Sequence, residues 1–150
     1  MKIEIDVPNR ATSDEKLSSL MKGIGVDLLE PYRDFLLEQN GGVPVNGIFY
    51  YGDGGSSGVI FFGVDTGENY NDLKWNYEVY KDRIPKGFFP IGNDPGGNLI
   101  CIDVKGDQSV YFWDHEREEQ PPSRSNIYKI ADSFEGFLAL LKPDEDGEDW

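Results

Sequence analysis

Apolar residues recur every three or four positions in several segments of the chain, which is the spacing of an amphipathic helix. The first predicted helix starts at a capping-box pattern, Thr12 and Glu15, and is broken by the glycines in residues 23–25. The second starts at Pro31, which suits a first helical turn, and stops at the Asn-Gly-Gly sequence of residues 40–42. These patterns predict two helices before any strand.

Two further helices are predicted later in the chain. Leu73 and Tyr77 belong to a helically spaced set that predicts a helix over residues 69–83, which a following proline ends. The last helix follows a second capping-box pattern, Asp132 and Glu135, and its apolar residues line one face.

Runs of β-branched and aromatic residues between these helices predict strands. The first two runs flank the Gly- and Ser-rich residues 54–58, which predict a hairpin turn, and a second hairpin turns at residues 93–97. The order of helices and strands predicts an α+β fold, a single domain with a mainly antiparallel mixed sheet packed against several helices. The predicted strands cover residues 48–51, 59–64, 88–92, 98–103, 109–113 and 127–130.

Three of these segments, taken in order, resemble the landmarks of one protein family. They are the helix that ends in Asn40-Gly41-Gly42, the hairpin that contains Pro90-Ile91-Gly92, and the closing strand and helix around Ser133-Phe134. Their order and spacing are similar to those of the SUKH superfamily, which contains bacterial immunity proteins of toxin systems and fungal Smi/Knr-type cell-wall assembly regulators. The chain departs from the family pattern at Asn98, where many members carry an aspartate.

The length of 150 residues fits one domain that can bury a core without disulfides or metals. The resemblance implies a SUKH-like domain over residues 13–142. It is preceded by an N-terminal segment, residues 1–12, and followed by an acidic tail, residues 143–150, that we expect to be disordered.

Charge and cysteine content narrow the range of partners and compartments. The chain has 28 acidic and 14 basic residues, a net charge of −14 and a pI near 4.3, so it repels nucleic acid and anionic membranes and attracts basic proteins. No segment has the length of a membrane span or the pattern of a secretory signal, and we therefore expect a cytoplasmic protein. The single cysteine, Cys101, lies in an apolar strand and is expected to be a core residue.

The sequence holds only weak candidates for catalysis. Residues 54–58 match the letters of a nucleophile elbow around Ser56, with His115 as the one possible imidazole base, but they lie between two predicted strands and not between a strand and a helix. A single histidine rules out a multi-histidine metal site. We therefore predict no catalytic residue, metal or cofactor, and keep a Ser56 hydrolase only as a minor alternative.

The resemblance implies an immunity protein that neutralises a cognate toxin, such as a basic nuclease-type toxin, by direct protein–protein binding. The alternative is a non-enzymatic Smi/Knr-like scaffold or regulator in cell-wall or envelope processes. Trp75 is a candidate anchor of a partner interface, whereas Trp113 fits the core better, and the oligomeric state stays open. The candidate partner-binding residues are loop acids, each of which also fits a simple solvated position: Asp53, Asp65, Glu68, Asp72, Asp94, Glu116, Glu118 and Glu119.

Overall fold

A seven-stranded antiparallel sheet organises the computed structural model, which describes residues 2–52 and 54–144. The strands are β1 (Ile5–Pro8), β2 (Gly42–Pro44), β3 (Ile48–Tyr51), β4 (Gly55–Gly58), β5 (Ile60–Phe61), β6 (Phe88–Asn93), β7 (Leu99–Asp103), β8 (Val110–Trp113) and β9 (Ile127–Ala131). The helices are α1 (Asp14–Ile24), α2 (Tyr32–Gln39), α3 (Leu73–Tyr80) and α4 (Phe134–Leu140), with 3-10 turns η1 (Asn69–Asn71) and η2 (His115–Arg117).

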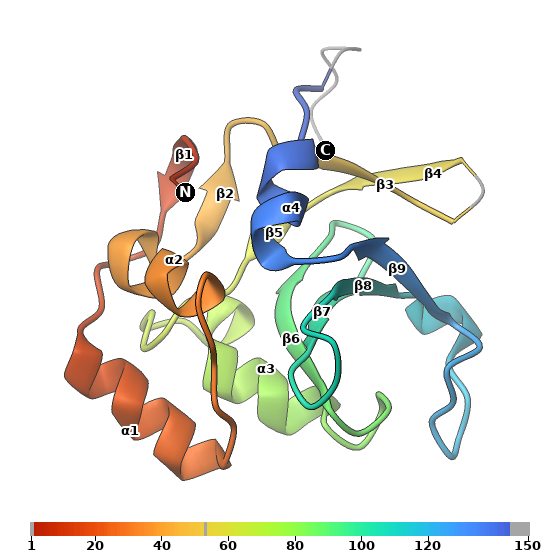
Figure 1. Cartoon of the computed structure of the whole chain (residues 1–150), viewed down its shortest axis with the longest axis horizontal. Helices are drawn as coiled ribbons and strands as arrows, with labels where there is room; N and C mark the ends of the chain where they lie inside the picture. The colour runs from red at the N-terminus through yellow and green to blue at the C-terminus, as the bar shows by residue number, and fades with distance from the viewer. Residues whose placement is uncertain (1, 53, 145–150) are drawn as a thin grey trace.

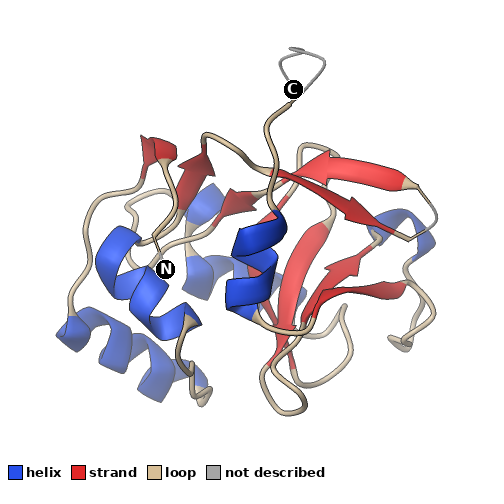
Figure 2. Ribbon diagram, turned by 45° about the horizontal axis from the view of Figure 1, so that its top comes forward, coloured by secondary structure: helices blue, strands red, loops and turns tan. Residues whose placement is uncertain are grey.

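The large sheet has the strand order β1-β2-β5-β6-β7-β8-β9, and β3 and β4 form a separate two-stranded sheet (Figure 1). Helices α1, α2 and α3 gather toward one side of the molecule, and β6–β9 with the β3–β4 hairpin lie toward the other (Figure 2). The predicted α+β class is confirmed. Residues 5–8, which the sequence placed in a segment ahead of the domain, form the edge strand β1 and pair with β2.

The hairpin of β6 and β7 is present as predicted and forms the centre of the sheet. Pro90 lies opposite Cys101, and the register shifts between Pro90 and Gly92, so a bulge accommodates a proline that cannot donate to the ladder. A Cβ added at Gly92 would lie 2.6 Å from the carbonyl oxygen of Ile60. Glycine at position 92 is therefore what lets β5 pair with β6.

The prediction of a hairpin between residues 48–51 and 59–64 is wrong. The partner of β3 is β4, the Gly-Ser-Ser-Gly segment that the sequence assigned to the turn, and β5 joins the large sheet instead. Glycine and serine have weak strand propensity, so β4 gives no sequence signal. β4 is held in place by its partner β3, which is itself packed on the core. In β3, Phe49 packs on Phe137, and Tyr51 stacks on Phe112 with ring centroids 3.8 Å apart.

Both capping-box predictions are displaced by one residue. Ser13 and not Thr12 caps α1 by accepting the N–H of Lys16, and Ser133 and not Asp132 caps α4 by accepting the N–H of Gly136. In each case two polar residues precede the helix, and the second one has the extended backbone of a cap and makes the capping hydrogen bond.

The helix predicted over residues 69–83 is interrupted. Asp72 takes an extended backbone between η1 and α3, and its side chain accepts the N–H of Trp75, so the regular helix starts only at Leu73. The second predicted helix is present as α2, and Asn40 ends it in the left-handed conformation with φ of 51°.

The side chain of Asn40 is buried and joins three parts of the chain. Its Nδ2 donates to the carbonyl oxygens of Arg10 and Val64 at 2.9 and 3.0 Å, and its Oδ1 accepts the Val64 N–H at 2.7 Å. A Cβ added to the following residue, Gly41, would overlap the carbonyl oxygen of Phe62. The Asn-Gly-Gly sequence thus fixes the N-terminal segment and the chain after β5 against the end of α2.

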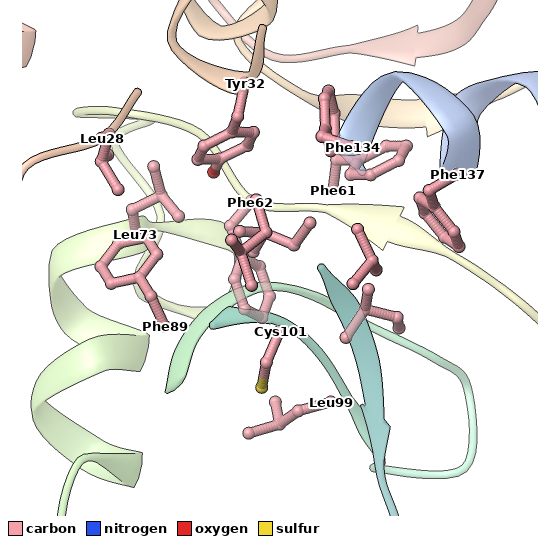
Figure 3. Packing of buried hydrophobic residues seen from close by; sticks show 14 of the residues in the cluster. Leu28, Tyr32, Phe61, Phe62, Leu73, Phe89, Leu99, Cys101, Phe134 and Phe137 are labelled. Atoms are coloured by element: carbon pink, nitrogen blue, oxygen red, sulfur yellow. The ribbon is translucent and has the colours of Figure 1, made fainter. Parts of the chain in front are cut away.

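Twelve of the 28 buried residues of the core are aromatic, and the rest are aliphatic apart from Cys101 (Figure 3). Phe35 contacts both Phe61 and Phe134 at centroid distances of 5.1 Å. Trp113 is buried, as predicted. Cys101 is also fully buried, and burial raises the pKa of its thiol, so it is a core residue without thiolate character.

Tyr32 carries a polar group into this core. Its ring contacts Phe134 edge-on at 5.0 Å, but its hydroxyl has no hydrogen-bond partner in the described part of the chain, and burial raises the pKa of the phenol.

Removing an unsatisfied buried hydroxyl is neutral or stabilising. We predict that Tyr32→Phe keeps or raises the free energy of unfolding in urea, by up to about 1 kcal/mol. Tyr32→Ala, the control, should lose about 3 kcal/mol or more, and a clear loss in Tyr32→Phe would contradict the prediction.

Candidate partner-binding surface

The structure does not bring the predicted acids together. Asp65, Glu68 and Asp72 lie in the loop between β5 and α3. A second set lies near the β6–β7 turn and in the loop after β8; it comprises Asp94, Glu116, Glu118 and Glu119. Asp53 lies outside the described residues, as does the predicted acidic tail from residue 145 onward.

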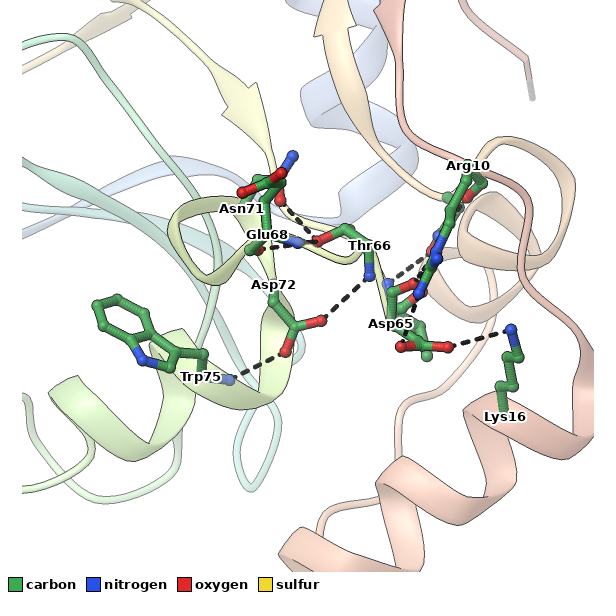
Figure 4. A network of polar contacts seen from close by, with 10 residues as sticks. Arg10, Lys16, Asp65, Thr66, Glu68, Asn71, Asp72 and Trp75 are labelled. Atoms are coloured by element: carbon green, nitrogen blue, oxygen red, sulfur yellow. Dashed lines mark hydrogen bonds and ion pairs between the residues drawn. The ribbon is translucent and has the colours of Figure 1, made fainter.

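Asp65 links the N-terminal segment to α1. Its carboxylate lies 3.0 Å from Nη2 of Arg10 and 3.1 Å from Nζ of Lys16 (Figure 4). The hydrogen bond from Lys16, followed by the charge of Arg10, lowers the pKa of Asp65. Because two cations already face it, Asp65 is less available to a basic partner than its exposure suggests.

Asp72 shapes the same loop. Its two oxygens accept the N–H groups of Trp75 at 3.2 Å and Thr66 at 3.3 Å, and the Thr66 hydroxyl bonds to Oδ1 of Asn71 at 2.6 Å (Figure 4). The side chain of Glu68 is exposed and makes no ion pair with any described residue. Of the three acids in this loop, Glu68 is therefore the one whose carboxylate has no ion pair or hydrogen bond with a described residue.

A groove of about 520 Å³ runs between α1 and this loop. Carboxylates of Asp65 and Asp72 line it together with the ammonium groups of Lys16 and Lys74. The mixed charge does not select a simple anion or cation.

Asp94 is buried and holds the β6–β7 turn. Its Oδ1 accepts the N–H groups of Gly96 and Asn98 at 3.0 and 2.8 Å, and its Oδ2 accepts Nδ2 of Asn98 at 3.1 Å. Oδ1 of Asn98 then faces His115, accepting its backbone N–H at 3.1 Å and lying 2.6 Å from its Nδ1. The amide of Asn98 thus donates to Asp94 on one side and accepts from His115 on the other, and a carboxylate at this position could not donate to Asp94.

The loop after β8 is closed at its base. The N–H of Asp114 donates to the carbonyl oxygen of Asn126 at 3.0 Å, and Nδ2 of Asn126 donates to the carbonyl oxygen of Asp114 at 2.8 Å. Glu119, within the loop, accepts the hydroxyls of Ser123 and Ser125, which lowers the pKa of its carboxyl. Glu116 is exposed and makes no ion pair with the described residues. Unlike Glu118 and Glu119, its carboxylate has no side-chain partner among the described residues.

Glu118 forms a two-point contact with Arg83, with N–O distances of 2.7 and 3.0 Å. The guanidinium of Arg83 also lies 4.9 Å from the ring centre of Tyr80 and 5.7 Å from that of Trp113. The hydrogen bond from Arg83 lowers the pKa of Glu118. This acid therefore fastens its loop to the end of α3.

The described residues do not support the hydrolase alternative. Ser56 lies in β4 opposite Tyr50, and Nδ1 of the only histidine, His115, is engaged by Asn98. In residues 2–52 and 54–144, His, Cys, Asp and Glu side chains form no group of three that could hold a metal ion. No helix in this part of the chain is long and apolar enough to cross a membrane.

Three exposed apolar residues lie in η1 and α3, next to the first acidic loop in the chain, and the sequence pointed to only one of them. Trp75 was a candidate anchor, and its side chain is 41% exposed, pointing away from the loop network (Figure 4). Tyr70, at 68%, and Val79, at 39%, were not predicted. The signal for Val79 was its four-residue spacing from Trp75 on the face of α3 opposite Leu73.

Comparison with known proteins identifies the family. A model of the SMI1/KNR4 family (SUKH-1) matches residues 11–140, most of the chain, and the chain belongs to this family. It is also 29% identical over 148 residues to the SPbeta prophage-derived uncharacterized protein YokK of Bacillus subtilis (strain 168), an alignment that covers 86% of this chain and 74% of that protein. The resemblance seen in the sequence motifs is thereby confirmed.

The role of Asn98 leads to a first prediction for this region. Asn98→Asp should place a second carboxylate against Asp94 and remove the donated hydrogen bond, lowering the free energy of unfolding at neutral pH by about 1–3 kcal/mol. The loss should shrink as acid protonates the facing carboxyls. Asn98→Ala, the control, removes the same hydrogen bonds without adding charge, so its loss should not show this recovery in acid. Urea unfolding at pH 7 and pH 4 measures both, and equal pH profiles would contradict the prediction.

The Arg83–Glu118 contact leads to a second prediction. Because the native contact lowers the pKa of Glu118, its contribution to stability is present above the unfolded-state pKa of about 4.3 and is lost as the pH falls through the lowered native pKa. Arg83→Gln should therefore cost about 1 kcal/mol near neutral pH, a modest amount because both side chains are partly exposed. The difference from the parent protein should shrink in acid to the part that comes from the packing of Arg83 on Tyr80 and Trp113. Thermal unfolding between pH 7 and pH 3 tests this, and a constant difference would count against the contact.

Proposed function

We propose that this protein is an immunity protein that neutralises a cognate toxin by direct protein–protein binding. Its support is membership of a family that includes toxin-immunity proteins. The observation that carries the proposal is the largely unneutralised acidic surface. Residues 2–52 and 54–143 hold 22 acidic residues, and only five of these make an ion pair there: Asp65, Asp107, Asp114, Glu118 and Asp132.

The proposed mechanism is stoichiometric occlusion of the toxin. A toxin that acts on nucleic acid carries a basic groove for its substrate, and an acidic protein surface can occupy that groove in place of phosphates. A net charge of −14 speeds the encounter with such a surface through long-range attraction. The protein would act without a cofactor, and nucleic acid itself would be repelled.

The test starts by identifying the partner. The purified chain is used as bait in a lysate of its source organism, and a captured protein with a toxin-like domain is purified and assayed. We expect full suppression of its activity at a 1:1 ratio, and an association rate that falls about tenfold or more between low and high salt. A partner from envelope biogenesis, or a toxin whose activity is unchanged, would overturn the proposal in favour of the scaffold or regulator.

Charge variants separate local contacts from overall attraction. We predict that Glu68→Gln combined with Glu116→Gln, which removes the two freest loop acids, slows association with the toxin several-fold. The matched control, Asp6→Asn combined with Glu38→Gln, removes the same charge from exposed positions on β1 and α2. It should have a clearly smaller effect. Equal effects would show that net charge alone acts and that these loops make no contact.

A further inference from the structure

We infer that the partner docks on the exposed face of η1 and α3, and that it presents an arginine-bearing basic surface there. This anchor face comprises Tyr70, Trp75 and Val79, with Glu68, Glu78 and Asp82 around it. The inference rests on the proposed function only in assuming that the protein acts by binding another protein.

The exposed apolar residues are concentrated on this face. Three of the seven large apolar side chains that are exposed in the described residues lie within ten positions, from Tyr70 to Val79. The other four are spread over separate elements: Val7, Leu29, Val45 and Tyr50. Scattered exposed apolar residues are normal, but a short segment that exposes both a tryptophan and a tyrosine has the residue types in which binding hot spots are enriched.

The fold holds the anchor face rigidly. The opposite side of α3 is anchored in the core through Leu73, which is fully buried, and through Tyr77, which contacts Phe89 at 5.5 Å. The buried side chain of Asn76 donates from Nδ2 to the carbonyl oxygens of Tyr70 at 3.2 Å and Asp72 at 2.9 Å, fastening η1 onto the first turn of α3. Binding here therefore costs little ordering of the protein.

Acids outnumber bases around the anchor face: Glu68, Glu78 and Asp82 are exposed there, against the exposed Lys74 and Lys81. Glu78 is three positions from Trp75 on α3, so its carboxylate lies on the same side of the helix as this anchor, and Asp82 follows two residues after the end of the helix. Neither of these acids nor Glu68 has an ion pair with a described residue. Carboxylates next to aromatic rings match a guanidinium, which pairs with the acid and stacks on the ring.

The molecule already contains one arginine in such a setting. The guanidinium of Arg83 packs over the rings of Tyr80 and Trp113 while it binds Glu118 at two points. The anchor face offers the same two components, aromatic rings and free carboxylates, without the arginine. A partner arginine would complete it.

The first arm of the test uses the purified protein and short peptides as probes. Indole N–H signals are recorded by NMR during titration with hexa-arginine and, separately, hexa-lysine at equal ionic strength, with the Trp75 signal assigned from Trp75→Phe. We expect the Trp75 signal to move with hexa-arginine at a concentration several-fold lower than with hexa-lysine. The buried Trp113 serves as an internal reference and should not move. No shift at Trp75, or equal shifts with both peptides, would overturn the inference.

The second arm uses the neutralised toxin. Trp75→Ala should weaken the complex on the order of thirty-fold, the loss typical of a hot-spot residue. The control is Tyr50→Ala, which removes an aromatic ring that is 55% exposed on the separate β3–β4 sheet and should leave affinity unchanged. Thermal unfolding confirms that both variants are folded.

The outcomes separate the two proposals. If the protein neutralises the toxin and Tyr50→Ala but not Trp75→Ala weakens the complex, the docking face is wrong and the immunity function stands. If no toxin is neutralised, the immunity function fails, and the peptide titration alone decides whether the anchor face binds arginine.

Discussion

One buried amide, the side chain of Asn40, sets the arrangement on which the rest of the molecule depends. It bonds the backbone of Arg10 on one side and of Val64 on the other, while the next residue, Gly41, lies too close to Phe62 for any side chain. A buried amide that satisfies backbone groups of three segments is costly to lose. From Val64 the chain continues into the acidic loop, η1 and α3. The hydrogen bonds of Asn40, at the end of α2, therefore fix where the proposed docking face begins.

Sequence patterns predicted the elements that have strong local signals. The spacing of apolar residues identified the helices, and the Pro-Ile-Gly hairpin was found because glycine and asparagine mark its turn. The caps were misplaced by one residue because Thr12-Ser13 and Asp132-Ser133 each offer two suitable side chains, and backbone geometry decides between them. Strand β4 was missed because its pairing comes from the packing of β3 and not from its own residues.

The site was harder to predict because charge in a sequence does not show whether a side chain is free. The glycines and asparagines around Asp94 are typical of an exposed turn, yet Asp94 is buried and its carboxylate holds the turn together. Glu118 is bound to the guanidinium of Arg83. Glu68 and Glu116 look no different in sequence, but they have no such partners among the described residues. Of the exposed apolar residues, only Trp75 was predicted, because the exposure of Val79 depends on how α3 is rotated against the sheet and that of Tyr70 on the separate turn η1.

The closed base of the loop after β8 has a consequence for how the protein can change over evolutionary time. Asp114 and Asn126 join the two ends of the loop, and Asn98 ties its start to the central hairpin. Insertions and deletions between such fixed ends add little closure entropy and leave the strands undisturbed. Residues 119–125, which follow the contact of Glu118 with Arg83, can therefore diversify in length and charge while the scaffold stays constant, and a lineage could acquire new binding preferences there without rebuilding its fold.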